Sequence, residues 1–124
     1  MLLTTLVTGP RAVDRERAIA MAIEPGLPTA IILEGIASGS SHLDALAENP
    51  QIQLVRIAPG CMCCTGNLTL RVTLNRILRH PPHRLLIGLA TDTHIAQIRK
   101  FLTDPPYDVL LTISDTLIAA PAKE

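Results

Sequence analysis

The sequence predicts an α/β fold, a three-layer sandwich built around a mainly parallel, five-stranded sheet. Five short, almost continuously apolar runs recur along the 124 residues, and segments with helical or turn-like patterns separate them. Strands that are apolar on both faces are typical of parallel sheets, because helices cover both sides of such sheets. The length suits one domain with one hydrophobic core.

The first two strands and the helix between them come from the amino-terminal part of the chain. The run 2–8 is mostly apolar and ends at Gly9-Pro10. Apolar residues recur through 12–23 at a spacing that gives a helix one hydrophobic side, and Glu24-Pro25-Gly26 ends it. The run 29–33, TAIIL, predicts the second strand, which Glu34-Gly35 closes.

The middle of the chain predicts a short helix, a strand and a longer helix. Residues 42–48 form the short helix, with Ser41 as its amino-terminal cap. Residues 52–58 predict the third strand, because most of their side chains are apolar. Residues 67–79 have approximately helical spacing, and Pro81-Pro82 ends that helix.

The last elements are a strand at 84–90, a helix at 93–102 and a strand at 108–114. The sequence Asp104-Pro105-Pro106 ends the helix between these two strands. We assign residues 1–118 to a single domain and residues 119–124 to a frayed tail.

Charge and hydropathy argue against nucleic-acid and membrane partners. Lys+Arg and Asp+Glu balance at 11 each, whereas proteins that bind phosphate backbones normally carry a basic surplus. No apolar run approaches the roughly 20 residues of a membrane span. The start, MLLTTLVTGPR, lacks the features of a secretion signal. We therefore expect a cytoplasmic protein, and its low net charge is compatible with a homo-oligomer.

All three cysteines, Cys61, Cys63 and Cys64, lie in the stretch GCMCCTGNL directly after the third strand. Ligands gather at the carboxyl ends of parallel strands. Thiolates suit Zn(II), which we expect here, and Cu(I), which is an alternative. Three thiolates leave a tetrahedral ion one open position, as in catalytic or transferring sites. Redox sensing and inert burial are the other two interpretations of these thiols.

A fourth ligand has several possible sources. His42 leaves the second strand on the same sheet edge as the cysteines and is the candidate that we retain. His80 and His83 lie on a proline turn, where histidines are more often solvated than metal-bound. A second chain is a further source.

The order of these features resembles the CobW-like family of P-loop GTPases and metallochaperones, the CobW/HypB/UreG nucleotide-binding domain. The resemblance rests on a first strand ending in Thr8-Gly9, on the later stretch from Gly60 to Cys64, and on Gly66-Asn67-Leu68 opening a helix. It implies a P-loop NTPase-like fold, of which this chain covers the front portion. It also implies a metal-binding role for the cysteine segment.

The phosphate-binding loop departs from the family pattern G-x-x-x-x-G-K-[ST]. Counted from Gly9, Asp14 replaces the second glycine, Arg15 the lysine and Glu16 the hydroxyl residue. Two carboxylates repel a triphosphate, so we do not expect GTP and Mg²⁺ to bind, and Gly9 and Arg15 remain only as a residual nucleotide site. Arginines alternate with these carboxylates, which predicts a solvated helix face with local ion pairs.

Other family elements are also replaced or missing. Gly88 stands where an acidic residue is expected after the fourth strand, although Asp92 follows nearby. The sequence ends soon after Ser114-Asp115, without the N-K-x-D element that binds guanine. Leu33-Glu34-Gly35 matches an N-E-x-G-like segment in part, and an ordinary strand end explains it equally well.

These observations predict a metal-binding domain that is related to metallochaperone GTPases, has lost GTP hydrolysis and is not an enzyme. Its expected partner is a metal-recipient protein or a second copy of itself. Two alternatives remain. The first is an atypical GTPase that uses Arg15 and the amides of the first helix. The second is a non-catalytic scaffold that pairs with a full-length relative.

Overall fold

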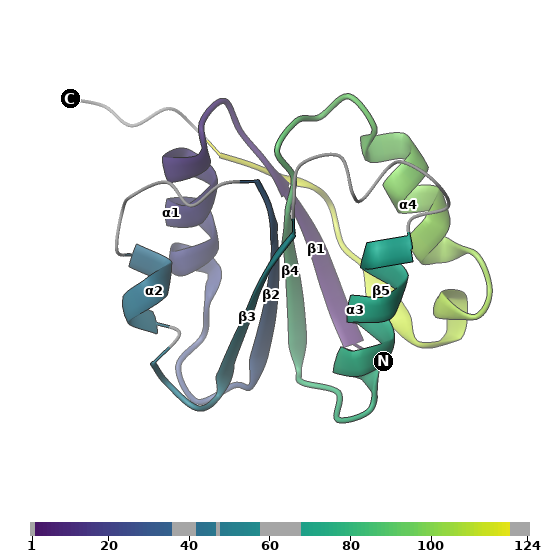
Figure 1. The fold of residues 1–124 in the computed structure, drawn as a ribbon, viewed down its shortest axis with the longest axis horizontal. Helices are drawn as coiled ribbons and strands as arrows, with labels where there is room; N and C mark the ends of the chain where they lie inside the picture. Colours follow the sequence, from purple (N-terminus) through teal and green to yellow (C-terminus); the bar gives the residue numbers. More distant parts are fainter. Residues whose placement is uncertain (1, 36–41, 47, 58–67, 120–124) are drawn as a thin grey trace.

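The computed structural model describes residues 2–35, 42–46, 48–57 and 68–119. Strands and helices alternate along the chain, as the sequence predicts (Figure 1). The strands are β1 (Leu2–Thr8), β2 (Thr29–Glu34), β3 (Ile52–Ile57), β4 (Arg84–Gly88), β5 (Leu111–Ile113) and β6 (Leu117–Ile118). The helices are α1 (Ala12–Ala22), α2 (His42–Leu46), α3 (Leu68–Leu78), α4 (Ile95–Thr103) and the 3₁₀ helix η2 (Tyr107–Val109).

The strands form one parallel sheet in the order β3-β2-β4-β1-β5, and β6 pairs with the far end of β1. Helices α1 and α2 lie on one face, and α3 and α4 lie on the other (Figure 1). The predicted three-layer α/β fold is confirmed. The expected number of five strands is one too few, because β6 adds a short parallel pairing of Leu117 with Val7.

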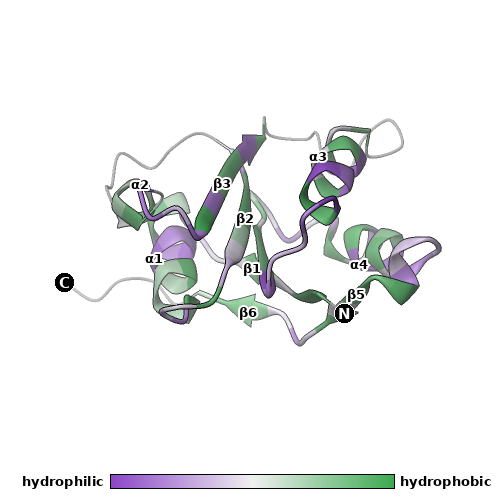
Figure 2. Cartoon of the chain, turned by 90° about the horizontal axis from the view of Figure 1, so that it is seen from below, coloured by the Kyte–Doolittle hydropathy of each residue, from purple (hydrophilic) through white to green (hydrophobic). Residues whose placement is uncertain are grey.

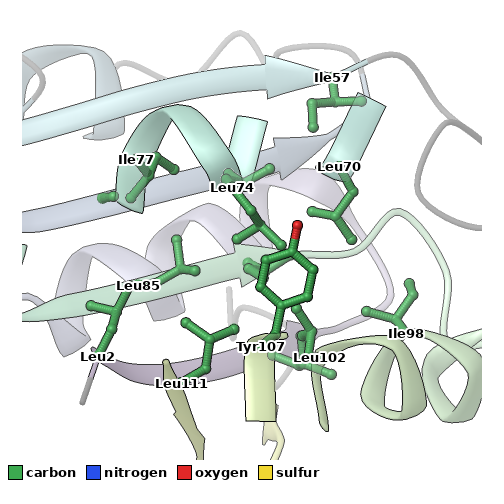
Figure 3. Close-up of a cluster of buried hydrophobic side chains, with 14 of the residues drawn as sticks. Leu2, Ile57, Leu70, Leu74, Ile77, Leu85, Ile98, Leu102, Tyr107 and Leu111 are labelled. Carbon is green, nitrogen blue, oxygen red and sulfur yellow. The ribbon is translucent and has the colours of Figure 1, made fainter. Parts of the chain in front are cut away.

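Two hydrophobic clusters fill the spaces between the sheet and its two helical layers. The larger cluster includes Leu6, Ile87, Leu74 and Leu102 and lies on the side of α3 and α4 (Figure 3). The smaller cluster is centred on Ile19, from α1, with apolar residues of the strands around it. Apolar strand segments therefore lie between two helical layers in Figure 2, which explains why their sequences are apolar without alternation.

Strand β5 is shorter than the expected 108–114, because the chain first makes the turn η2. This turn places the ring of Tyr107 in the larger cluster, where it is only 3% exposed and packs at 5.2 Å from the ring of Phe101. The Tyr107 hydroxyl donates to Oδ1 of Asn75 at 2.9 Å. The predicted strand is therefore wrong for residues 108–110.

Ala119 is 5% exposed, and its amide donates to the carbonyl of Thr8 at 2.7 Å. The described part of the chain thus includes Ala119 of the expected tail, and residues 120–124 lie outside it. Gly9 lies against Ala119, since a Cβ at position 9 would be 2.7 Å from the Ala119 Cβ. None of the described helices has the length and apolar character needed to cross a membrane.

Candidate functional site

The junction between β1 and α1 lies at the carboxyl edge of the sheet, where a phosphate-binding loop would be found. Gly9 follows β1, and Arg11 precedes α1 with an extended backbone (φ −132°, ψ 154°) and no side-chain cap. The residues that differ from the family pattern, Asp14, Arg15 and Glu16, form the first turns of α1. All three are buried, so the prediction of a solvated helix face is wrong for them.

Arg15, at the lysine position of the family pattern, bends back onto its own loop. Its Nη1 donates to the carbonyl of Gly9 at 2.9 Å, and the residue is 8% exposed. Burial lowers the pKa of the Arg15 guanidinium, while the carboxylates of Glu16, Glu34 and Asp14 oppose that shift. Arginine keeps its charge at neutral pH even so. The two predicted residual nucleotide residues, Gly9 and Arg15, are therefore bonded to each other.

Asp14, at the position of the second glycine, is held by a two-point contact. Its carboxylate accepts from Arg11 Nε at 2.9 Å and from Arg11 Nη2 at 3.1 Å. This hydrogen bond raises the pKa of the Arg11 guanidinium, and the charge of Asp14 acts in the same direction. The predicted local ion pair is confirmed here.

Two further carboxylates connect α1 and the strand ends. Glu16, at the hydroxyl position, has its Oε2 at 3.6 Å from Nη1 of Arg56 on β3. Glu34 ends β2, and its Oε1 accepts from the amide of Ala90 at 2.9 Å, just beyond the end of β4. Glu34 thus bridges two strand ends, a role beyond that of an ordinary strand-end residue.

We call Arg15, Glu16, Glu34 and Arg56 the charged cluster. Their side chains line a pocket whose cavity is only about 10 Å³. That volume is close to the minimum for one water molecule, so the cluster is closed to a nucleotide. Arg56 was not predicted as a site residue, although a single charge within the apolar run of β3 was a signal for a buried partner.

A larger cleft of about 450 Å³ lies next to the charged cluster, between the carboxyl ends of β1 and β4. Its lining consists of Thr8, Gly9, Pro10, Ala90, Thr91, Asp92 and Ile118. Among these residues there is a carboxylate and no cationic side chain. The charges of this lining do not fit a triphosphate, because GTP sites neutralise phosphate with lysine and Mg²⁺.

The cysteine segment, with Cys61, Cys63 and Cys64, lies outside the described residues, so the structure describes only its flanks. Strand β3 ends at Ile57, whose carbonyl accepts from the amide of Gly35 at 2.9 Å. The backbone of His42 begins α2, and its side chain lies outside the described part. Within the described residues, no three His, Cys, Asp or Glu side chains are grouped closely enough to hold a metal ion.

His80 and His83 lie at the amino-terminal ends of the strands. Both precede β4, and the His83 amide donates to the carbonyl of Pro28, just before β2 begins. The cysteine segment follows the other, carboxyl end of the parallel strands. These two histidines are therefore poor candidates for the fourth ligand, in contrast to His42, which follows the carboxyl end of β2.

Comparison with known proteins gives one family and one relative. Residues 17–120 match the family described as CobW/HypB/UreG, nucleotide-binding domain. The chain is 39% identical over 74 residues to the zinc chaperone YeiR of Escherichia coli (strain K12), a stretch that covers 59% of this chain and 23% of that protein. This chain therefore corresponds to less than a quarter of that relative. No solved structure matches.

Proposed function

This chain belongs to the CobW/HypB/UreG nucleotide-binding domain family, and we propose that it binds zinc through Cys61, Cys63 and Cys64 and passes it on without hydrolysing GTP. One observation carries the proposal: three of the four consecutive positions 61–64 are thiols, and they follow closely on the strand β3. A relative that shares 39% identity over 74 residues is named a zinc chaperone, which supports the choice of metal.

Thiolate chemistry accounts for capture and release. Three thiolates bind Zn(II) tightly and leave one tetrahedral position for a thiol or imidazole of the recipient protein. Cu(I) remains the alternative metal, because it also prefers sulfur ligands. His42, with which α2 begins on the carboxyl side of β2, is the proposed ligand within the chain that holds this fourth position until the recipient's ligand displaces it. We place this exchange in the cytoplasm, where thiols stay reduced.

The loss of GTP hydrolysis is supported by the contacts around α1. Arg15 donates to Gly9 of its own loop, and Asp14 is bonded to Arg11. Glu16 places a carboxylate where the family pattern has a hydroxyl that holds Mg²⁺. The charged cluster leaves a cavity of about 10 Å³. These internal contacts engage the side chains that a bound phosphate would need, which supports the proposal.

The second candidate is an atypical nucleotide-binding protein, and the cleft of about 450 Å³ beside Gly9 favours it. Hydroxyls of Thr8 and Thr91 line that cleft and could accept or donate hydrogen bonds to a ribose or a base. Titration with a fluorescent GTP analogue in millimolar Mg²⁺ separates the candidates. We expect no saturable binding, and saturation at micromolar concentration would favour the second candidate.

The metal proposal is tested by elemental analysis of protein purified without chelator. We expect close to one zinc per chain in the parent and none in the variant with Cys61, Cys63 and Cys64 all changed to Ser. The matched control is His80→Ala with His83→Ala. It removes two potential ligands at the amino-terminal ends of the strands, away from the cysteine segment, and should retain the metal. Equal, negligible metal in parent and cysteine variant would contradict the proposal.

A further inference from the structure

Strand β3 is the long open edge of the sheet. Among the described residues it pairs with β2 and with no other strand (Figure 2). The opposite edge is formed by β5, which has only three residues, whereas β3 has six. Natural sheets usually protect such edges with proline, lysine, bulges or short length. The sequence of β3, IQLVRI, contains no proline, glycine or lysine.

The backbone of β3 alternates between its partner strand and the open side. The carbonyl of Gln51 accepts from the Thr29 amide, and that of Ile57 accepts from the Gly35 amide, both at 2.9 Å. Because successive residues of a strand direct their N–H and C=O groups to opposite sides, Val55 also faces β2. The N–H and C=O of Leu54 therefore point away from the sheet.

The side chains of this edge are compatible with a second strand. Gln53 is exposed, and Leu54 and Val55 are partly buried, which suits the margin of a sheet. Arg56 carries the only charge of β3 and is directed to Glu16 of its own chain. In an antiparallel pairing about the middle of the strand, Arg56 lies opposite an apolar residue instead of a second arginine. Like charges therefore do not oppose the pairing.

We propose that a second copy of this chain pairs with β3 in antiparallel orientation, about a two-fold axis near the middle of the strand. In this dimer the Leu54 N–H donates to a carbonyl of the second copy, and the Leu54 carbonyl accepts from an N–H of the second copy. The two sheets thereby become one. Such isologous contacts are the commonest route to symmetric dimers. The formal net charge of zero gives no long-range repulsion between the copies.

The dimer does not depend on the proposed metal function. The carboxyl ends of two antiparallel β3 strands point in opposite directions, about 20 Å apart for six residues. The two cysteine segments therefore leave from opposite ends of the joined strands. Each copy therefore keeps its own set of three thiols.

Light scattering coupled to size exclusion tests the proposal on the full chain and on the Cys61, Cys63 and Cys64→Ser variant. Both should show twice the mass of the 13.3 kDa chain at high concentration and dissociate on dilution. Leu54→Pro removes the outward N–H without removing a bond to β2, and should weaken the dimer at least tenfold. Ile113→Pro, on β5 at the opposite edge, is the control and should leave the dimer intact. The bonds of Leu110 and Ser114 to β1 show that Thr112 also faces β1, so the N–H of Ile113 points outward like that of Leu54.

Thermal unfolding under monomeric conditions shows whether each variant is folded. If Leu54→Pro unfolds, Leu54→Lys replaces it, since lysine at an edge opposes pairing while it keeps the backbone groups. A parent that is monomeric at all concentrations overturns the proposal. A dimer that persists in a folded Leu54→Pro or Leu54→Lys variant overturns it as well.

Discussion

The carboxylate of Glu16 on α1 lies 3.6 Å from the guanidinium of Arg56 on β3, and it thereby joins the first helix to the strand that precedes the cysteines. The Glu16 side chain is 4% exposed and that of Arg56 is 27% exposed. The pair is therefore partly shielded from water, and its attraction is stronger than that of a surface pair.

Replacing Arg56 by Met should lower the free energy of unfolding by about 1–3 kcal/mol, because a charge that faces a buried carboxylate is lost. This expected loss of stability is smaller than that for breaking a fully buried ion pair, since Arg56 is partly exposed. Urea denaturation measures it. Lys100→Met is the control, because its pair with Asp104 is exposed and should contribute less than about 1 kcal/mol. Equal losses in the two variants would contradict the prediction.

Replacing Gly9 by Ala should destabilise the fold by about 1–3 kcal/mol, as overpacking does. The new Cβ would lie 2.7 Å from the Cβ of Ala119 and 3.2 Å from Cγ of Arg15. Combining it with Ala119→Gly removes the closest contact and should recover part of the loss. Additive losses in the double variant would show that the contact is not responsible.

Replacing Tyr107 by Phe should cost about 1 kcal/mol near neutral pH, since the hydrogen bond to Asn75 is lost. Burial raises the pKa of Tyr107, so the unfolded chain ionises first as the pH rises. The stability that the neutral phenol provides is complete below pH about 10 and is lost above it. Urea midpoints between pH 8 and 11 should therefore fall less steeply in the variant. If the urea midpoints of parent and variant fell equally with pH, Tyr107 would not be the source of the pH dependence.

The proposed metal site should weaken on acidification, because protons compete with Zn(II) for each thiolate. With thiol pKa values of about 8.5, lowering the pH from 7.5 to 6 should reduce the apparent affinity by more than tenfold. Competition against a chelator of known affinity measures this change, with the chelator's own pH dependence taken into account. A pH-independent affinity would point to ligands other than the cysteines.

The strand and helix positions were predictable because periodicity and proline punctuation are local properties. The prediction of 52–58 for β3 agrees with the structure at every described residue, and that of 67–79 for α3 differs by one residue at its carboxyl end. Residues 58 and 67 lie outside the described part. Strand β6, in contrast, has two residues and leaves no periodic signal. Its pairing with β1 depends on a contact between distant parts of the chain.

The charged cluster was not predictable from pattern alone. Alternating charges in α1 resemble a solvated helix, and burial becomes evident only when partners are known. Those partners, Gly9 for Arg15 and Arg56 for Glu16, come from a loop and from a strand much further along the chain. The sequence shows that Asp14, Arg15 and Glu16 depart from the pattern G-x-x-x-x-G-K-[ST], but it does not show which internal contacts these side chains make.

The hydrogen bond from the Ala90 amide to Glu34 fixes the segment after β4 with atoms of the protein itself. In proteins that respond to nucleotides, comparable segments are ordered by a bound phosphate and released when it is hydrolysed. A segment anchored by its own chain does not need a bound phosphate to hold it. Under the proposed function, delivery of zinc is then timed by mass action alone, through the recipient's abundance and its affinity for the metal.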